Sequence, residues 1–117
     1  MDVDVLFAGV PVTDFARARA WYVRLFGREP DILANDEEVL WQVAGAGWLY
    51  VVADVARAGG ALVAMAVADL DATVALLVQR DVAVGPAVRQ GEAGRKAVAV
   101  DPDGNSVALI EVAAAGH

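Results

Sequence analysis

Two segments of the chain repeat the same order of hydrophobic and polar positions. Val12–Phe15 opens a segment whose apolar residues recur with helical period as far as Leu25. Val67–Leu70 opens a similar segment that runs to Arg80 and begins 55 residues later. In both segments an alternating apolar run meets an aspartate before the helical pattern starts, which indicates that one structural unit is used twice.

The first unit contains signals for one strand, one helix and three further strands. Val3–Val12 has the composition of a strand, and Asp14 is a good N-cap for the helix that follows. Gly27 and Pro30 are placed to end that helix. The residues of its predicted buried stripe are Ala18, Trp21, Tyr22 and Leu25. Short strands are then predicted near Asp31–Ala34, Glu38–Ala44 and Trp48–Ala53.

The second unit repeats this order. Asp69 or Asp71 caps its helix, and the predicted apolar stripe consists of Val74, Leu77 and Val78. Its later strands are predicted near Val82–Arg89, Arg95–Val100 and Ser106–Val112. We therefore expect one domain over residues 1–117, made of two βαβββ repeats at about 1–54 and 61–117 with a linker at 55–60. The predicted fold class is α+β: paired βαβββ modules form a curved eight-stranded mixed sheet with the helices on its convex face.

Composition excludes several classes of function. The formal net charge is −7 and no stretch is basic, so a nucleic-acid partner is not expected. There is no cysteine, and the only histidine is His117, which argues against a thiol or histidine site. The longest uncharged run, Val39–Ala53, is shorter than the roughly 18 residues of a membrane span. With an acidic N-terminal sequence, these features predict a cytoplasmic protein without a membrane partner.

Two motifs resemble one known family. Val10–Phe15, followed by Trp21-Tyr22 and Leu25-Phe26-Gly27, resembles the first βα unit of the vicinal oxygen chelate superfamily. That superfamily includes glyoxalase I, extradiol dioxygenases and bleomycin-resistance proteins. Asp101–Glu111, which reads DPDGNSVALIE, resembles its last hairpin. With the repeat, the resemblance covers nearly the whole chain, and it implies paired βαβββ modules and a homodimer.

The resemblance also implies where a metal would bind. Metal-dependent members carry histidine seven residues before the aspartate that caps the helix, and that position is Phe7. The equivalent position of the second half is Leu62, and the glutamate position of the last strand falls at Ala108. None of these side chains can coordinate a divalent cation. We therefore expect no metal, no cofactor and no metal catalysis, and the bleomycin-resistance type of binding protein is the branch most similar to this sequence.

Strand alternation predicts a binding face in place of the metal. If Phe7 points into the concavity, the residues on its face are mostly small and apolar. The predicted ligand-binding residues are Phe7, Gly9, Trp41, Trp48, Tyr50, Leu62, Ala64, Ala108 and Ile110. Trp41 and Gln42 point in opposite directions, so only one of them can face a ligand. Arg89, Arg95 and Lys96 are the only clustered bases and offer a contact for an anionic ligand, whereas Glu111 is expected to be solvated or paired with an arginine.

The favoured interpretation is a homodimer that binds a small molecule without a metal. An acidic chain with aromatic strands suits a planar compound, cationic or neutral and mainly apolar, such as an antibiotic that the protein sequesters. Two alternatives stay open. One is an enzyme of the same family that acts without the usual His/Glu metal site, and the other is a homodimeric scaffold with a vestigial pocket.

Overall fold

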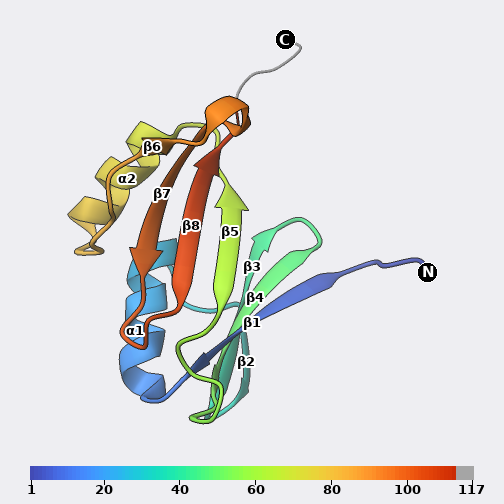
Figure 1. Ribbon diagram of the computed structural model, residues 1–117. Helices are drawn as coiled ribbons and strands as arrows, with labels where there is room; N and C mark the ends of the chain where they lie inside the picture. Colours follow the sequence, from blue (N-terminus) through green and yellow to red (C-terminus); the bar gives the residue numbers. More distant parts are fainter. Residues whose placement is uncertain (113–117) are drawn as a thin grey trace.

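Each half of the chain folds as a strand, a helix and three strands (Figure 1). The structure is a computed structural model that describes residues 1–112. The elements of the first half are β1 (Leu6–Val12), α1 (Phe15–Phe26), β2 (Ile32–Asn35), β3 (Glu38–Ala44) and β4 (Gly47–Ala53). Those of the second half are β5 (Leu62–Ala66), α2 (Leu70–Gln79), β6 (Val88–Arg89), a short 3-10 helix (Gly91–Ala93), β7 (Arg95–Val100) and β8 (Ser106–Glu111).

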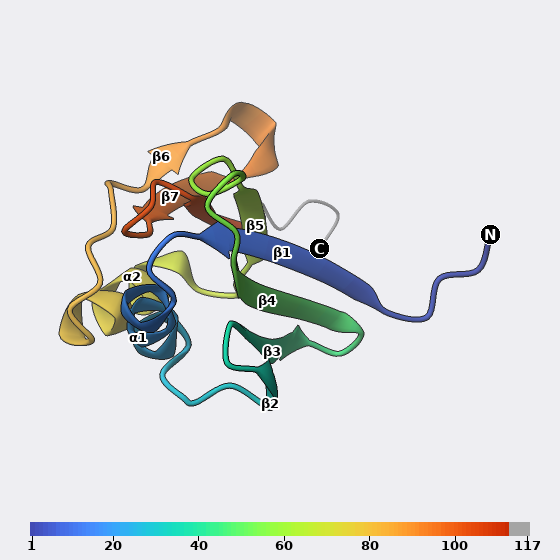
Figure 2. The same cartoon turned by 90° about the horizontal axis from the view of Figure 1, so that it is seen from below.

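The eight strands form two mixed sheets of four strands each. Their orders are β1-β4-β3-β2 in the first sheet and β5-β8-β7-β6 in the second. The pairs β1–β4 and β5–β8 are parallel, and the remaining pairs are antiparallel. In the described part of the chain no strand pairing joins the sheets, so β1 and β5 are both edge strands (Figure 2). The α+β class and the βαβββ order are confirmed, whereas the expected continuous eight-stranded sheet is divided in two.

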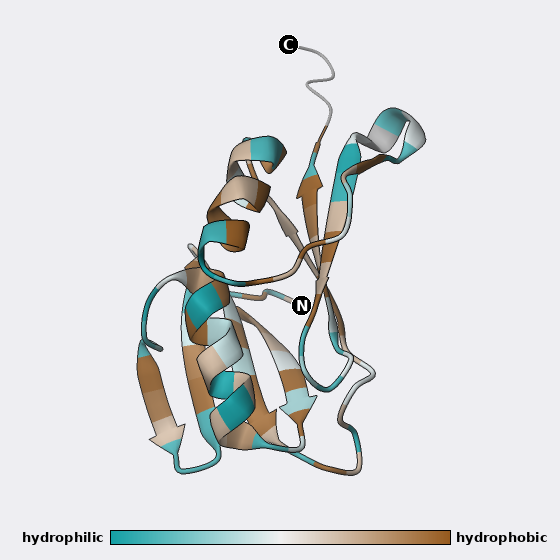
Figure 3. Ribbon diagram, turned by 90° about the vertical axis from the view of Figure 1, so that its left-hand side faces the viewer, coloured by the Kyte–Doolittle hydropathy of each residue, from teal (hydrophilic) through white to brown (hydrophobic). Residues whose placement is uncertain are grey.

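Both helices lie on the same side of the molecule, in front of the sheets in Figure 3. Asp14 and Asp69 cap them, because their carboxylates accept the backbone N–H groups of Arg17 and Ala72 at 3.1 and 3.0 Å. Gly27 ends α1 with a φ of 72°, a left-handed conformation that favours glycine. No helix within residues 1–112 has the length and apolar character needed to cross a membrane.

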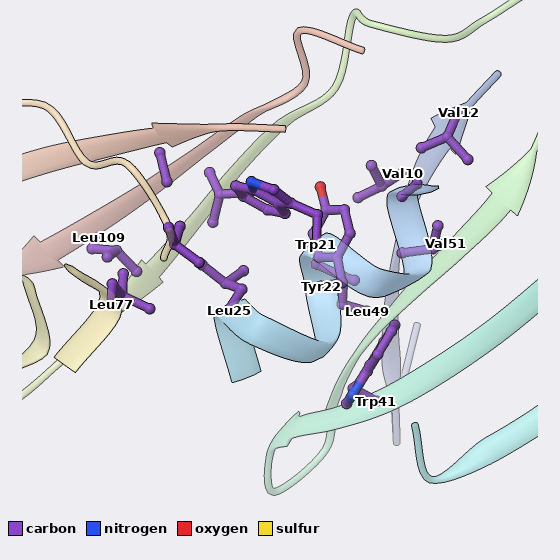
Figure 4. Close-up of a cluster of buried hydrophobic side chains, with 14 of the residues drawn as sticks. Val10, Val12, Trp21, Tyr22, Leu25, Trp41, Leu49, Val51, Leu77 and Leu109 are labelled. Carbon is purple, nitrogen blue, oxygen red and sulfur yellow. The ribbon is translucent and has the colours of Figure 1, made fainter. Parts of the chain in front are cut away.

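The buried core joins both halves of the molecule. All four residues of the predicted α1 stripe are buried, and they pack between side chains of the two sheets (Figure 4). Tyr22 lies near Val10 and Trp41 of the first sheet, whereas Leu25 points toward Leu77 and Leu109 of the second half. Burying this apolar surface on both sides of α1 is what holds the halves together.

The stripe of α2 differs from the predicted one. Leu77 is buried and Val74 is partly buried, but Val78 is 63% exposed and Leu70 takes its place in the core. The predicted strands at Val3–Val12 and Val82–Arg89 are also shorter than expected. β1 starts at Leu6, and β6 contains only two residues, with an isolated bridge from Val84. Gly85 N–H still donates to the carbonyl of Val98 in β7 at 2.9 Å, and the ladder is interrupted at Pro86, because proline cannot donate a backbone hydrogen bond.

The DPDGN segment is a tight turn that also connects the two halves. Asp101 and Asn105 are buried in it. The Tyr22 hydroxyl donates to the Asp101 carboxylate at 2.9 Å, and the Asn105 amide donates to the carbonyl of Pro11 at 2.8 Å. The Thr13 hydroxyl donates to Asp103 Oδ1 at 2.6 Å. These contacts fix the end of β1 against the second half.

Candidate functional site

The first sheet has one face under α1 and one face without a helix. Val10, Leu49 and Val51 are buried on the helix side. Successive residues of a strand point to opposite faces, so Phe7, Trp48 and Tyr50 lie on the other face. We call this the open face of the first sheet. Its lining is aromatic, and Phe7 is 51% exposed.

The aromatic residues of this open face are held by strand register. Phe7 pairs with Trp48 and Gly9 pairs with Tyr50 across the parallel β1–β4 ladder. The Phe7 and Trp48 ring centroids are 6.1 Å apart, with 30° between the ring planes. A Cβ atom at Gly9 would lie 2.4 Å from Cζ of Tyr50, so the tyrosine ring lies directly against the glycine backbone. The structure thus brings together four of the predicted site residues.

Trp41 is not part of this face. It is completely buried on the helix side, with its ring centroid 5.3 Å from that of Phe26 and 6.2 Å from that of Tyr22. Its indole Nε1 donates to the carbonyl of Arg28 at 3.0 Å. The prediction that Trp41 lines the site is therefore wrong, because its strand phase places it in the core. Gln42, which pairs with Trp48, takes the position on the open face.

The second sheet has a matching open face of small and aliphatic residues. Ala97, Ala99, Val107 and Leu109 are buried on its helix side. The alternate residues of β5 and β8 form the other face, where Leu62 pairs with Ser106, Ala64 with Ala108 and Ala66 with Ile110. Leu62 is 88% exposed, and Ala108 and Ile110 are half-buried. The predicted residues of this half therefore share one uncovered face, which we call the open face of the second sheet.

An apolar cleft lies where the two sheets approach each other. It has a volume of about 330 Å³, in the lower part of the range for small-molecule pockets. Trp48 and Ala64, one predicted residue from each half, both line it. Its other lining residues are Leu6, Ala8, Val43, Ala44, Gly47, Leu49, Val63, Met65 and Ala66. Sequence reasoning missed most of these, because Leu6, Val63 and Met65 have the strand phase that it assigned to the face packed under the helices.

Charged side chains are few on the open faces. Glu38, which the sequence analysis gave only a strand position, pairs with Val52 and so shares the face of Tyr50. Lys96 pairs with Ile110 on the second sheet. Arg95 points to the helix side, where Asp71 and then Glu111 hold its guanidinium and raise its pKa above the usual value. The contact of Arg95 with Glu111 at 3.2 Å confirms the prediction that Glu111 pairs with an arginine, and Glu111 also accepts the backbone N–H of Leu70 at 2.7 Å.

A divalent metal does not fit the expected positions. The side chains of Phe7, Leu62 and Ala108 carry no nitrogen, oxygen or sulfur atom that could act as a ligand. Within residues 1–112, no three His, Cys, Asp or Glu side chains gather closely enough to hold a metal ion. His117 lies outside the described residues.

The fold and the sequence were compared with those of known proteins. The sequence matches no family model and no curated protein. Among solved structures, a glyoxalase/bleomycin resistance protein from Catenulispora acidiphila is 38% identical, with a TM-score of 0.87 over 93% of this chain and 98% of that chain. TnmS3, an antibiotic-binding protein from Streptomyces sp. CB03234, is 26% identical, with a TM-score of 0.76 over 96% and 98%. A bleomycin-binding protein in complex with bleomycin shares the fold, with a TM-score of 0.77 at 21% identity over 95% of this chain and 100% of that chain.

The first of these similarities extends over nearly the whole length of both chains. In this structure the first βα unit and the DPDGN hairpin lie against each other. The chain belongs to the glyoxalase/bleomycin resistance protein family.

Proposed function

We propose that this protein binds a planar, mainly apolar small molecule without a metal ion and thereby sequesters it, as an antibiotic-binding protein does. The observation that carries the proposal is the aromatic open face of the first sheet, whose Trp48 also borders the apolar cleft between the two sheets. Aromatic pairs favour stacking with a flat ligand by about 0.5–1.5 kcal/mol beyond area burial. The family relationship to a named antibiotic-binding protein agrees with this function.

Metal independence is part of the proposal. The positions where a family metal would bind hold Phe7, Leu62 and Ala108, so the free energy of binding must come from apolar contact. A ligand that enters such a site needs only a few polar contacts to fix its orientation. The same residues offer no nucleophile or general base at the cleft, which favours binding over catalysis.

We further propose that the working unit is a homodimer. Large apolar side chains such as Phe7 and Leu62 are uncovered, and β1 and β5 are free edges. Pairing β1 of one copy with β5 of a second copy would complete an eight-stranded sheet, satisfy the free backbone groups of both edges and join the two open faces that carry these side chains. Light scattering should give twice the 12.2 kDa chain mass at micromolar concentration.

Ala64→Pro tests this edge pairing. Because Val67 N–H donates to Ile110 of β8, alternation directs the N–H of Ala64 toward the free edge of β5. The substitution should yield a folded monomer, since it removes an outward donor and leaves the β5–β8 ladder intact. A wild-type chain that scatters as 12.2 kDa throughout the micromolar range would reject the dimer.

Tryptophan fluorescence tests ligand binding. Trp21 and Trp41 are buried and Trp48 borders the cleft, so a planar compound in the cleft quenches Trp48 by contact and the other two only by energy transfer. A panel of acridines and anthraquinones should quench the emission at micromolar concentration, and Trp48→Phe should remove the contact part of this response. By calorimetry, Trp48→Ala should weaken the tightest compound about tenfold, the scale of one anchoring aromatic residue.

A substitution on the second sheet provides the counterpart, and one on α1 provides the control. Ala108→Trp should block binding, because Ala108 adjoins Ala64 at the cleft and a large ring fills the space beside it. Ala20→Trp adds the same ring to the exposed surface of α1 and should change nothing. If the tightest compound is indifferent to the changes at Trp48 and Ala108, the site assignment fails.

A further inference from the structure

The open face of the second sheet carries a single cation, Lys96, which is also the only lysine of the sequence. It lies in one row with Val88 of β6, Ile110 of β8 and Ala66 of β5. The residue is half-buried although it is charged, as expected for a lysine whose stem packs on apolar neighbours while its ammonium stays in water. The lysine therefore stands at the edge of an apolar surface.

The neighbouring bases are not available to a ligand on this face. Arg95 points to the helix side and is held by Asp71 and Glu111. Arg89 pairs with Arg95 across the β6–β7 ladder and shares that side. The ion pairs found within residues 1–112 all use arginine, and none provides a carboxylate for Lys96. Of the basic cluster noticed in the sequence, only Lys96 has both the position and the free charge to meet a ligand.

Lys96 lies within reach of a ligand that extends from the cleft over the β5 edge onto the open face of the second sheet. Ala66 lines the cleft, and Lys96 is two strands away in the same row, about 10 Å at ordinary strand spacing. The surface between them consists of Ile110 and the next row, Val98 and Ala108. A planar body of two or three fused rings that starts at the cleft and lies on this surface reaches the ammonium with its far end.

We propose that Lys96 makes the site selective for planar ligands that carry an acidic group, such as a sulfonate, carboxylate or phenolate. The inference rests on the proposed binding function and specifies its ligand class. A charge-assisted hydrogen bond from the ammonium, formed as the ligand displaces water from apolar neighbours, is stronger than the same bond in open solvent. The opposite charge on the open faces, Glu38, is on the first sheet and adjoins the exposed acidic residues Asp36 and Glu37, so it does not face a ligand that lies on the second sheet.

Two fluorescent probes with one skeleton test this selectivity. 8-Anilino-1-naphthalenesulfonate carries an acidic group, and N-phenyl-1-naphthylamine is the same molecule without it. Lys96→Met, which keeps the length of the stem, should weaken the sulfonate about tenfold and change the neutral probe less than about twofold, as expected for one charge-assisted contact. Lys96→Arg should retain most of the affinity. Added salt should weaken the sulfonate in the wild type and not in Lys96→Met.

Arg89→Met is the matched control, because it removes one positive charge from the same sheet but on the helix side. It should leave both probes unaffected. The role of Lys96 is overturned if Lys96→Met weakens the affinity for both probes equally, or leaves the affinity for the sulfonate unchanged. In either case, binding of the neutral probe to the wild type would still support the proposed function. Tighter binding of the cation proflavine, weakened by Glu38→Gln, would overturn it in favour of cationic ligands. If neither naphthalene probe nor proflavine binds the wild type, the proposed function itself fails.

Discussion

Asn105 is the residue through which the turn after β7 holds the two halves together, and Asn105→Ala tests that role. The side chain is completely buried and makes three hydrogen bonds. Its amide nitrogen donates to the carbonyl of Pro11 at 2.8 Å and to the Asp101 carboxylate at 2.9 Å. Its oxygen accepts the backbone N–H of Ala61 at 2.9 Å. Alanine removes all three bonds at once.

The expected loss of stability follows from what remains after the substitution. Each neutral hydrogen bond contributes about 1 kcal/mol net, and the bond to a charged group contributes about 1.5–3 kcal/mol. The carbonyl of Pro11 and the N–H of Ala61 are left without these partners, whereas Asp101 keeps its bond from Tyr22. We therefore expect Asn105→Ala to lower the free energy of unfolding by about 3–5 kcal/mol.

Urea unfolding followed by circular dichroism measures this change. Asn35→Ala, at the only other asparagine of the sequence, is the matched control, because the Asn35 side chain is exposed and accepts one local bond from Glu37 N–H at 2.8 Å. It should cost less than about 1 kcal/mol. If the two variants lose the same small amount, the contacts of Asn105 do not hold the halves together and the reasoning is refuted.

Three further predictions concern aromatic residues and their contacts. Burial raises the pKa of Tyr22, and the Asp101 carboxylate raises it further. Because the tyrosine of the unfolded chain ionises near pH 10 and the folded one does not, wild-type stability should fall as pH rises above about 10. Tyr22→Phe should lack this decline in urea titrations. Gly9→Ala should displace the ring of Tyr50 and weaken the tightest planar ligand severalfold in calorimetry, with little change in melting temperature. Trp41→Ala should lower unfolding free energy by about 3–5 kcal/mol; a folded variant with weakened binding alone would contradict its place in the core.

The sequence by itself determined the local elements of this protein. An aspartate before a helical apolar stripe and Gly27 at its end define α1, because caps and periodicity depend on residues within one or two turns. Strand alternation also assigned Phe7 and Gly9 to the binding face of the first half, and Leu62, Ala64, Ala108 and Ile110 to that of the second half, but it did not decide which of Trp41, Trp48 and Tyr50 share it. The metal positions could be judged from residue identity alone, since side chains without donor atoms cannot bind a metal in any fold.

Only the tertiary structure decided how the two halves meet. The cleft depends on the approach of β5 to the first sheet, and the role of Asn105 depends on Pro11, which is distant in sequence. The negative net charge of the whole chain suggested a cationic ligand. The charge that a ligand meets, however, depends on which charged side chains lie on the binding face. Asp71 and Glu111 hold Arg95 on the helix side, which leaves Lys96 as the cation of the open face. Contacts between residues far apart in sequence leave no periodic signal, because their spacing is set by packing and not by the repeat of a helix or strand.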